Sequence, residues 1–272
     1  MKYKIVFSDI DGTLLNKERQ LSSSTISEIK KLQGKIPFIL ISARMPSAMR
    51  HLQNELGIEA LPIISYNGGL ILIDNKVVSS TEIPMNIIES LTKWNIAHSC
   101  HLSIYHNDEW YVPQLDQWAA REINNTKVHP EVKDHKSIIE KWKTENKGAH
   151  KIMAMGEVSE IDKIVDFLSE NFSEELHLYR SKSTYLEISP KKISKLTAVK
   201  YLLEQHYKFE LDDVIAYGDN YNDVEMLHHV GFGVAVGNAR DEAKNVAKHI
   251  TSLSIEDGVA LSLQQLIPLT NW

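Results

Sequence analysis

Short stretches that are apolar on both faces recur along this chain, each followed by a helical pattern. Tyr3–Ser8 and Pro37–Ser42 are rich in β-branched and large apolar residues, and the segment after the second repeats Met49, Leu52 and Leu56 at helical spacing. Strands that are apolar on both faces need cover on both sides of their sheet. Alternating with helices, they predict an α/β fold with a Rossmann-like parallel sheet.

The α/β alternation stops after Ile83-Pro84 and resumes after Pro190. Residues 84–188 instead mix hairpin-like strands with helices and carry four of the five tryptophans of the chain. The sequence therefore predicts a core made of residues 1–83 and 189–272, split by an inserted α+β domain at 84–188.

The composition excludes several classes of protein. The chain has 272 residues, 43% of them hydrophobic and 24% charged, which is typical of a globular protein. A net charge of −6 provides no general attraction to nucleic acid or to an anionic membrane surface. Cys100 is the single cysteine, so no internal disulfide can form. With no signal-peptide or membrane-span pattern, we expect a cytoplasmic protein without nucleic-acid, membrane or obligate protein partners.

Polar side chains follow the predicted core strands at the points where these strands end. The carboxyl ends of parallel strands meet at one edge of a sheet, where such folds bind their ligands. A carboxylate beside a buried strand must be paired, neutralised or bound to a metal. The side chains expected at this edge are Asp9, Asp11, Ser42, Lys195, Asp219, Asn222 and Asp223.

Several carboxylates at one edge would repel one another and raise their own pKa values. A hard divalent cation with oxygen ligands removes this conflict. Mg²⁺ binds through few carboxylates and keeps waters and a substrate phosphate as its other ligands. The pattern therefore predicts a Mg²⁺ site at this edge of the sheet.

Four segments, "DIDGTL", "ISAR", "ISPKKISKLTAV" and "GDNYNDVEML", resemble the four motifs of the haloacid dehalogenase (HAD) superfamily. The insert lies after the second motif and before the lysine, which is similar to the Cof-like branch with its type IIB cap. The resemblance implies a Mg²⁺-dependent phosphatase that forms an aspartyl-phosphate. It also implies that residues 84–188 form a lid.

The resemblance assigns catalysis and metal binding to four acids. Asp9 would attack phosphorus as the nucleophile, and Asp11 would act as the general acid and base. Asp9, the backbone carbonyl of Asp11 and Asp219 would hold Mg²⁺. Asp223 would be a direct or indirect ligand, although a helix-capping role is an alternative for it.

The resemblance assigns phosphate binding to a second group. Ser42, Lys195 and Asn222 would contact phosphoryl oxygens through their side chains. Backbone N–H groups around Ile10 and Ala43 would add to them. Ser42 could also be an ordinary hydroxyl at a strand end.

Three positions depart from the superfamily pattern. Ala43, Lys192 and Leu196 stand where glycines are usual. Alanine at 43 is harmless if its φ is negative, whereas Leu196 could narrow the pocket or shift the start of the helix. Lys191 and Lys192 are rival cations to Lys195.

The substrate expected from the resemblance is a small phosphate ester, such as a sugar phosphate or a similar phosphomonoester. A phosphomutase is the nearest alternative, and a non-catalytic phosphate-binding protein is another. Arg44 is expected to pair with a carboxylate or to bridge the domains. It is therefore left out of the catalytic set.

Overall fold

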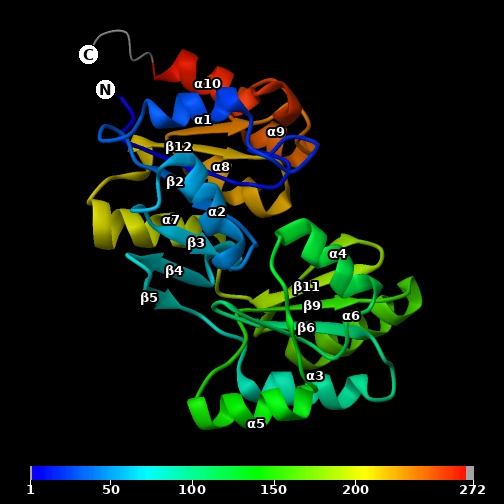
Figure 1. The fold of residues 1–272 in the computed structure, drawn as a ribbon. Helices are drawn as coiled ribbons and strands as arrows, with labels where there is room; N and C mark the ends of the chain where they lie inside the picture. Colours follow the sequence, from blue (N-terminus) through cyan, green and yellow to red (C-terminus); the bar gives the residue numbers. More distant parts are fainter. Residues whose placement is uncertain (1, 268–272) are drawn as a thin grey trace. The chain divides into compact units, whose positions relative to one another are not determined.

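The computed structural model describes residues 2–267 and divides the chain into two compact units. The first unit contains residues 1–78 and 194–272 except 45–48, and the second contains residues 79–193 together with 45–48. Each unit has its own sheet and its own helices (Figure 1). No helix in the described part of the chain is long and apolar enough to cross a membrane.

The sheet of the first unit has eight strands. They are β1 (Ile5–Ser8), β2 (Phe38–Ile41), β3 (Ile63–Ser65), β4 (Leu70–Ile73), β5 (Lys76–Ser80), β12 (Val214–Gly218), β13 (Phe232–Ala235) and β14 (His249–Ile250). Their order is β14-β13-β12-β1-β2-β3-β4-β5, with parallel pairing from β14 to β3 and antiparallel pairing between β3 and β4. Every residue of β1, β2 and β12 is buried, as the parallel-sheet prediction requires.

Six α-helices complete the described part of this unit. They are α1 (Ser23–Lys30), α2 (Ser47–Leu56), α7 (Lys195–Leu202), α8 (Val224–His229), α9 (Asp241–Val246) and α10 (Gly258–Leu266). Figure 1 draws α1 and α10 on one side of the strands and α7 and α8 on the other. The Ser22 side chain caps α1 by accepting a hydrogen bond from the N–H of Thr25.

Two connections of the first unit have distinctive backbone conformations. Helix α7 ends at Leu202, and a π-helical turn continues it over Leu203–Tyr207. Lys208, with φ of 58°, then closes it. Asp74 and Asn75 form the hairpin turn between β4 and β5, and both have positive φ, 51° and 59°.

The second unit is an α+β module. Its strands are β6 (His101–His106), β7 (Glu109–Val112), β8 (Glu131–Val132), β9 (Lys151–Met155), β10 (Leu176–Lys182) and β11 (Tyr185–Pro190). Its helices are α3 (Met85–Asn95), α4 (Gln117–Thr126), α5 (His135–Glu145) and α6 (Val158–Phe172). The sheet order is β10-β11-β9-β6-β7-β8, antiparallel except between β7 and β8.

The hydrophobic core of the second unit lies on one face of its sheet. Leu102 and Ile104 are alternate residues of β6 and pack with Trp142 of α5 and Ile164 of α6. Alternation along a strand is typical of a sheet with different environments on its two faces. The predicted fold class, a Rossmann-like parallel core split by an α+β insert, is confirmed.

Candidate active site

Polar residues follow adjacent strands of the first unit at the same edge of the sheet. β1 pairs in parallel with β12 and with β2, so the residues after these strands are neighbours. The N–H of Asp9 donates to the Tyr217 carbonyl at 3.0 Å. On the other side, the N–H of Ser42 donates to the Ile64 carbonyl at 3.0 Å. The strand ends thus hold the backbone of Asp9 and Ser42 in place.

Lys195 is the central cation of this edge. It is 1% exposed, and its Nζ donates to Asp9 Oδ1 at 2.5 Å and to Asp223 Oδ1 at 2.6 Å. Ser194 caps α7 in a capping box with Thr197, so the helix begins at Lys195. The rivals Lys191 and Lys192 are exposed and do not join this cluster.

The neighbour of Lys195, Leu196, is 2% exposed. The capping box starts α7 at residue 195, so the helix begins at the lysine, directly before the leucine. The nonpolar side chain is accommodated in the core of the first unit.

Three carboxylates converge beside Lys195. Ligand atoms of Asp9, Asp219 and Asp223 lie within 4.8 Å of one another. Thr13 Oγ1 donates to Asp219 Oδ1 at 2.7 Å. A Cβ added to Gly12, whose φ is +86°, would lie 2.5 Å from Asp219 Oδ2, so only glycine fits there.

Asp223 uses both of its carboxylate oxygens. Oδ1 accepts from Lys195, while Oδ2 accepts from the N–H groups of Asp219 and Asn220, each at 3.0 Å. This carboxylate therefore holds the turn after β12 as well as the lysine. Asp223 thus has the capping role that the sequence suggested, and it also lies beside the other acids, Asp9 and Asp219.

Burial and neighbouring charges shift the pKa values of two acids at this edge. Burial raises the pKa of Asp9 well above its usual value, Lys195 opposes the rise, and the charges of Asp223 and Asp219 add to it. Burial and the charge of Asp223 raise the pKa of Asp219 to about 6. A hard divalent cation bound to the carboxylate oxygens would offset the repulsion between these acids and favour their ionised forms. The residues present therefore fit Mg²⁺.

The side chain of Asp11 has a different environment. It is 43% exposed, and Arg44 binds it in a bidentate pair, from Nε to Oδ2 and from Nη2 to Oδ1, each at 2.7 Å. Burial alone would raise the pKa of Asp11, but the hydrogen bonds and charge of Arg44 outweigh burial and lower it. Arg44 thus pairs with a carboxylate, as expected, and this carboxylate is the expected general acid and base.

Asn222 is held by a residue that the sequence analysis did not single out. Its Nδ2 donates to Asn67 Oδ1 at 3.0 Å. Asn67 follows β3 in the stretch "YNGG", and an Asn-Gly pair directly after a core strand was the signal that could have indicated it.

Ile10 and Ala43, whose backbone N–H groups are expected to contact phosphate, directly follow Asp9 and Ser42 in the sequence. Ile10 is fully buried directly after Asp9. The φ of Ala43, directly after Ser42, is not positive, so alanine is tolerated in place of glycine.

A family profile described as haloacid dehalogenase-like hydrolase matches residues 6–263. The chain belongs to the haloacid dehalogenase superfamily. The Cof-like branch with its type IIB cap, which the four motifs predicted, is confirmed, and this HAD chain is an enzyme of the hydrolase class.

Relatives of this HAD chain match along nearly its whole length. A Haemophilus influenzae protein named "Putative phosphatase" is 35% identical over 272 residues, covering 98% of this chain and 100% of the relative. The 5-amino-6-(5-phospho-D-ribitylamino)uracil phosphatase YcsE of Bacillus subtilis is 28% identical, with 97% and 96% covered. The crystal structure of a haloacid dehalogenase-like hydrolase from Bacteroides thetaiotaomicron has a TM-score of 0.90 and 27% identity, with 98% and 100% covered.

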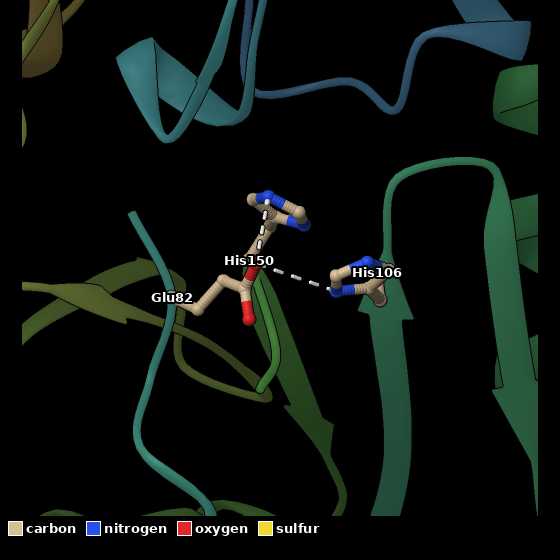
Figure 2. A group of neighbouring side chains, drawn as sticks. All are labelled: Glu82, His106 and His150. Atoms are coloured by element: carbon tan, nitrogen blue, oxygen red, sulfur yellow. Dashed lines mark ion pairs between the residues drawn. The ribbon is translucent and has the colours of Figure 1, made fainter. Parts of the chain in front are cut away.

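The second unit contains another group of ligand-type side chains, Glu82, His106 and His150. Figure 2 shows the Glu82 carboxylate facing both imidazole rings. Its Oε1 lies 3.8 Å from His106 Nδ1 and 3.9 Å from His150 Nε2. Two histidines and a carboxylate are a common metal-binding set, so their protons decide how this group is interpreted.

Hydrogen bonds place a proton on each nitrogen that faces Glu82. His106 Nδ1 donates to the Gly148 carbonyl at 2.9 Å. His150 Nδ1 accepts from the N–H of Asn107 at 3.0 Å, so the proton of the neutral ring is on Nε2, 3.0 Å from Ser80 Oγ. Burial and the nearby His106 lower the pKa of His150 to about 3, which keeps the ring neutral. These protons occupy the lone pairs that a cation would need.

Glu82 therefore acts as an acceptor that joins segments of the second unit. Its Oε2 accepts from the N–H of Gly148 at 2.6 Å and its Oε1 from Ser80 Oγ at 2.7 Å. Substituting Glu82→Ala should lower the free energy of unfolding by about 1–3 kcal/mol, because the buried N–H of Gly148 loses its acceptor. Denaturant unfolding measures this change.

Glu89→Ala is the matched control for Glu82→Ala. Glu89 forms an exposed ion pair with Lys143 in the same unit, and its loss should change stability by less than about 1 kcal/mol. Equal effects of the two substitutions would contradict the joining role of Glu82. A rise in the wild-type melting temperature with Zn²⁺, absent in Glu82→Ala, would show metal binding instead.

Proposed function

We propose that this enzyme is a Mg²⁺-dependent phosphatase that hydrolyses small phosphorylated metabolites, such as sugar phosphates or similar phosphomonoesters. The observation that carries the proposal is the buried ammonium of Lys195 between Asp9 and Asp223, at the sheet edge where Ser42 follows β2. A positioned cation beside a carboxylate nucleophile is what phosphoryl transfer chiefly requires. The relatives named as phosphatases support the same reaction class.

In the first half of the proposed reaction, Asp9 supplies the nucleophile. A carboxylate oxygen of Asp9 forms a bond to phosphorus as the bond from phosphorus to the leaving oxygen breaks. Asp11 gives a proton to that leaving oxygen. Lys195, Ser42 and Asn222 would hold the phosphoryl oxygens, aided by backbone N–H groups around Ile10 and Ala43.

In the second half, Asp11 takes a proton from water, whose oxygen attacks phosphorus and releases Asp9. The ion pair with Arg44 favours the ionised form of Asp11, which is the form that serves as a base. To act as an acid in the first half, Asp11 must take up a proton, so its contact with Arg44 has to weaken when substrate binds.

The metal site of the proposal uses residues already at the sheet edge. Asp9, Asp219 and the backbone carbonyl of Asp11 would hold Mg²⁺, with Asp223 acting through Lys195 and the turn after β12. Bound there, Mg²⁺ would neutralise charge on the phosphoryl oxygens. Three oxygen ligands from the protein leave positions for water and phosphate.

We further propose that residues 84–188 act as a lid that selects the leaving group and excludes water. The residues assigned to catalysis, metal binding and phosphate binding all lie outside this segment. A reducing cytoplasmic location is also proposed, and the single, buried cysteine is its support.

Metal removal tests the proposal directly. Excess chelator should stop phosphate release from an aryl phosphate, Mg²⁺ should restore it, and Ca²⁺ should restore it poorly because Ca²⁺ favours longer bonds and more ligands. Protons compete with the metal for Asp219, whose pKa is raised to about 6. The concentration of Mg²⁺ needed for half-maximal activity should therefore rise as the pH falls below about 6.

A panel of phosphate esters should then separate hydrolysis from the alternatives. The panel includes sugar phosphates and the substrate named for the Bacillus subtilis relative. Release of inorganic phosphate supports the phosphatase, and transfer to a second sugar would support a phosphomutase. Full activity in excess chelator would contradict the metal assignment.

A further inference from the structure

The loop between β3 and β4 has an unusual backbone. Tyr66, Asn67 and Gly68 have φ values of 53°, 55° and 105°. Positive φ is rare for a residue with a large side chain, and Tyr66 is also buried, with 1% exposure. Consecutive residues in this region persist only where their surroundings hold them, and such places are often functional.

Contacts on two sides hold this loop. The N–H of Tyr66 donates to the Arg44 carbonyl at 3.2 Å, and the N–H of Asn67 donates to the Ser42 carbonyl at 2.9 Å. On the other side, a Cβ added to Gly68 would lie 2.7 Å from the Ser194 carbonyl oxygen. The loop is therefore packed between the segment that carries Ser42 and the start of α7, whose first residue is Lys195.

The side chain of Asn67 adds a third connection. Its Oδ1 accepts the hydrogen bond from Asn222 Nδ2 at 3.0 Å, across 155 positions of sequence. Asn67 thus binds the backbone of Ser42 with its own N–H and the amide of Asn222 with its side chain. Both partners belong to the set proposed to hold phosphoryl oxygens.

We infer that Asn67 is a positioning residue of the phosphate site, which fixes the Asn222 amide relative to Ser42. The inference rests on the proposed phosphatase function. Asparagine suits the position because it tolerates positive φ better than most residues and also offers an amide acceptor, which glycine lacks. An amide that is already oriented needs no reorientation when phosphate arrives.

The substitution Asn67→Gly separates the side chain from the backbone, since glycine keeps the positive φ and removes the amide. We expect kcat/KM for a phosphate ester to fall about 10-fold and the Kd of inorganic phosphate, measured by calorimetry with Mg²⁺, to rise by a similar factor. Asn75→Gly is the matched control. Asn75 also has positive φ, 59°, and accepts a side-chain hydrogen bond from Arg50 Nε, but it lies in the turn between β4 and β5.

A double substitution tests whether Asn67 acts through Asn222. Asn222→Ala should weaken phosphate binding on its own, and adding Asn67→Gly should change it by less than about 2-fold further. Fully multiplicative effects, or an Asn67→Gly enzyme no different from Asn75→Gly, would overturn the inference. If the wild type hydrolyses no ester, the proposed function fails, and phosphate binding by the same variants still decides the role of Asn67.

Discussion

Asp9→Asn should reduce kcat by at least about 10³-fold, because an amide is a far weaker nucleophile than a carboxylate and cannot form the covalent intermediate. The fold should remain. Lys195 keeps Asp223 as its partner, and the change removes one of three converging carboxylates. Turnover of an aryl phosphate, followed over several hours, measures the loss.

The stability of Asp9→Asn gives a second readout. Burial raises the pKa of Asp9 in the folded protein, so its protonated form favours folding, and this contribution is lost as the pH rises through the folded pKa. At neutral pH without Mg²⁺, the substitution should therefore leave the melting temperature unchanged or raise it.

Asp74→Asn, at an exposed turn, is the control for Asp9→Asn and should keep normal activity. Near-normal turnover by Asp9→Asn would rule out the covalent mechanism. A large fall in its melting temperature would contradict the description of Asp9 as a functional acid in an unfavourable environment.

Lys195→Met should have the largest combined effect on activity and stability. Asp9 and Asp223 would lose their shared buried cation, and an uncompensated buried charge typically destabilises by about 3–5 kcal/mol. Phosphate turnover should fall by at least about 10²-fold, since the contact with phosphoryl oxygens is lost too. Denaturant unfolding and steady-state kinetics measure the two effects.

The loss of stability in Lys195→Met should depend on pH. Lys195 opposes the raised pKa values of Asp9 and Asp219, so without the lysine these two pKa values rise further, and protonation restores part of the folded state as the pH falls. Lys192→Met is the matched control, because Lys192 is exposed three residues away. Equal effects of the two substitutions at neutral pH would refute the central role of Lys195.

Much of the fold could be predicted because its signals are local. A strand that is apolar on both faces indicates a parallel sheet covered on both sides, whatever its position in the sheet. In the structure every residue of β1, β2 and β12 is buried. The same sheet geometry brings residues after adjacent strands together. That is why Asp9 and Ser42 could be placed at one edge from sequence alone.

The sequence by itself thus determined the fold class, the edge that carries the polar residues, and the family. Tertiary structure alone decided the partners: Arg44 on Asp11, Lys195 between two acids, and Asn67 on Asn222. The physical reason is range. The hydrophobic periodicity of a strand or helix, and hence its buried face, can be read from residues that are close in sequence. A hydrogen bond between side chains 155 positions apart depends on how the helices and strands pack against one another. An Asn-Gly pair predicts a turn, but it does not indicate which side-chain amide the asparagine will contact.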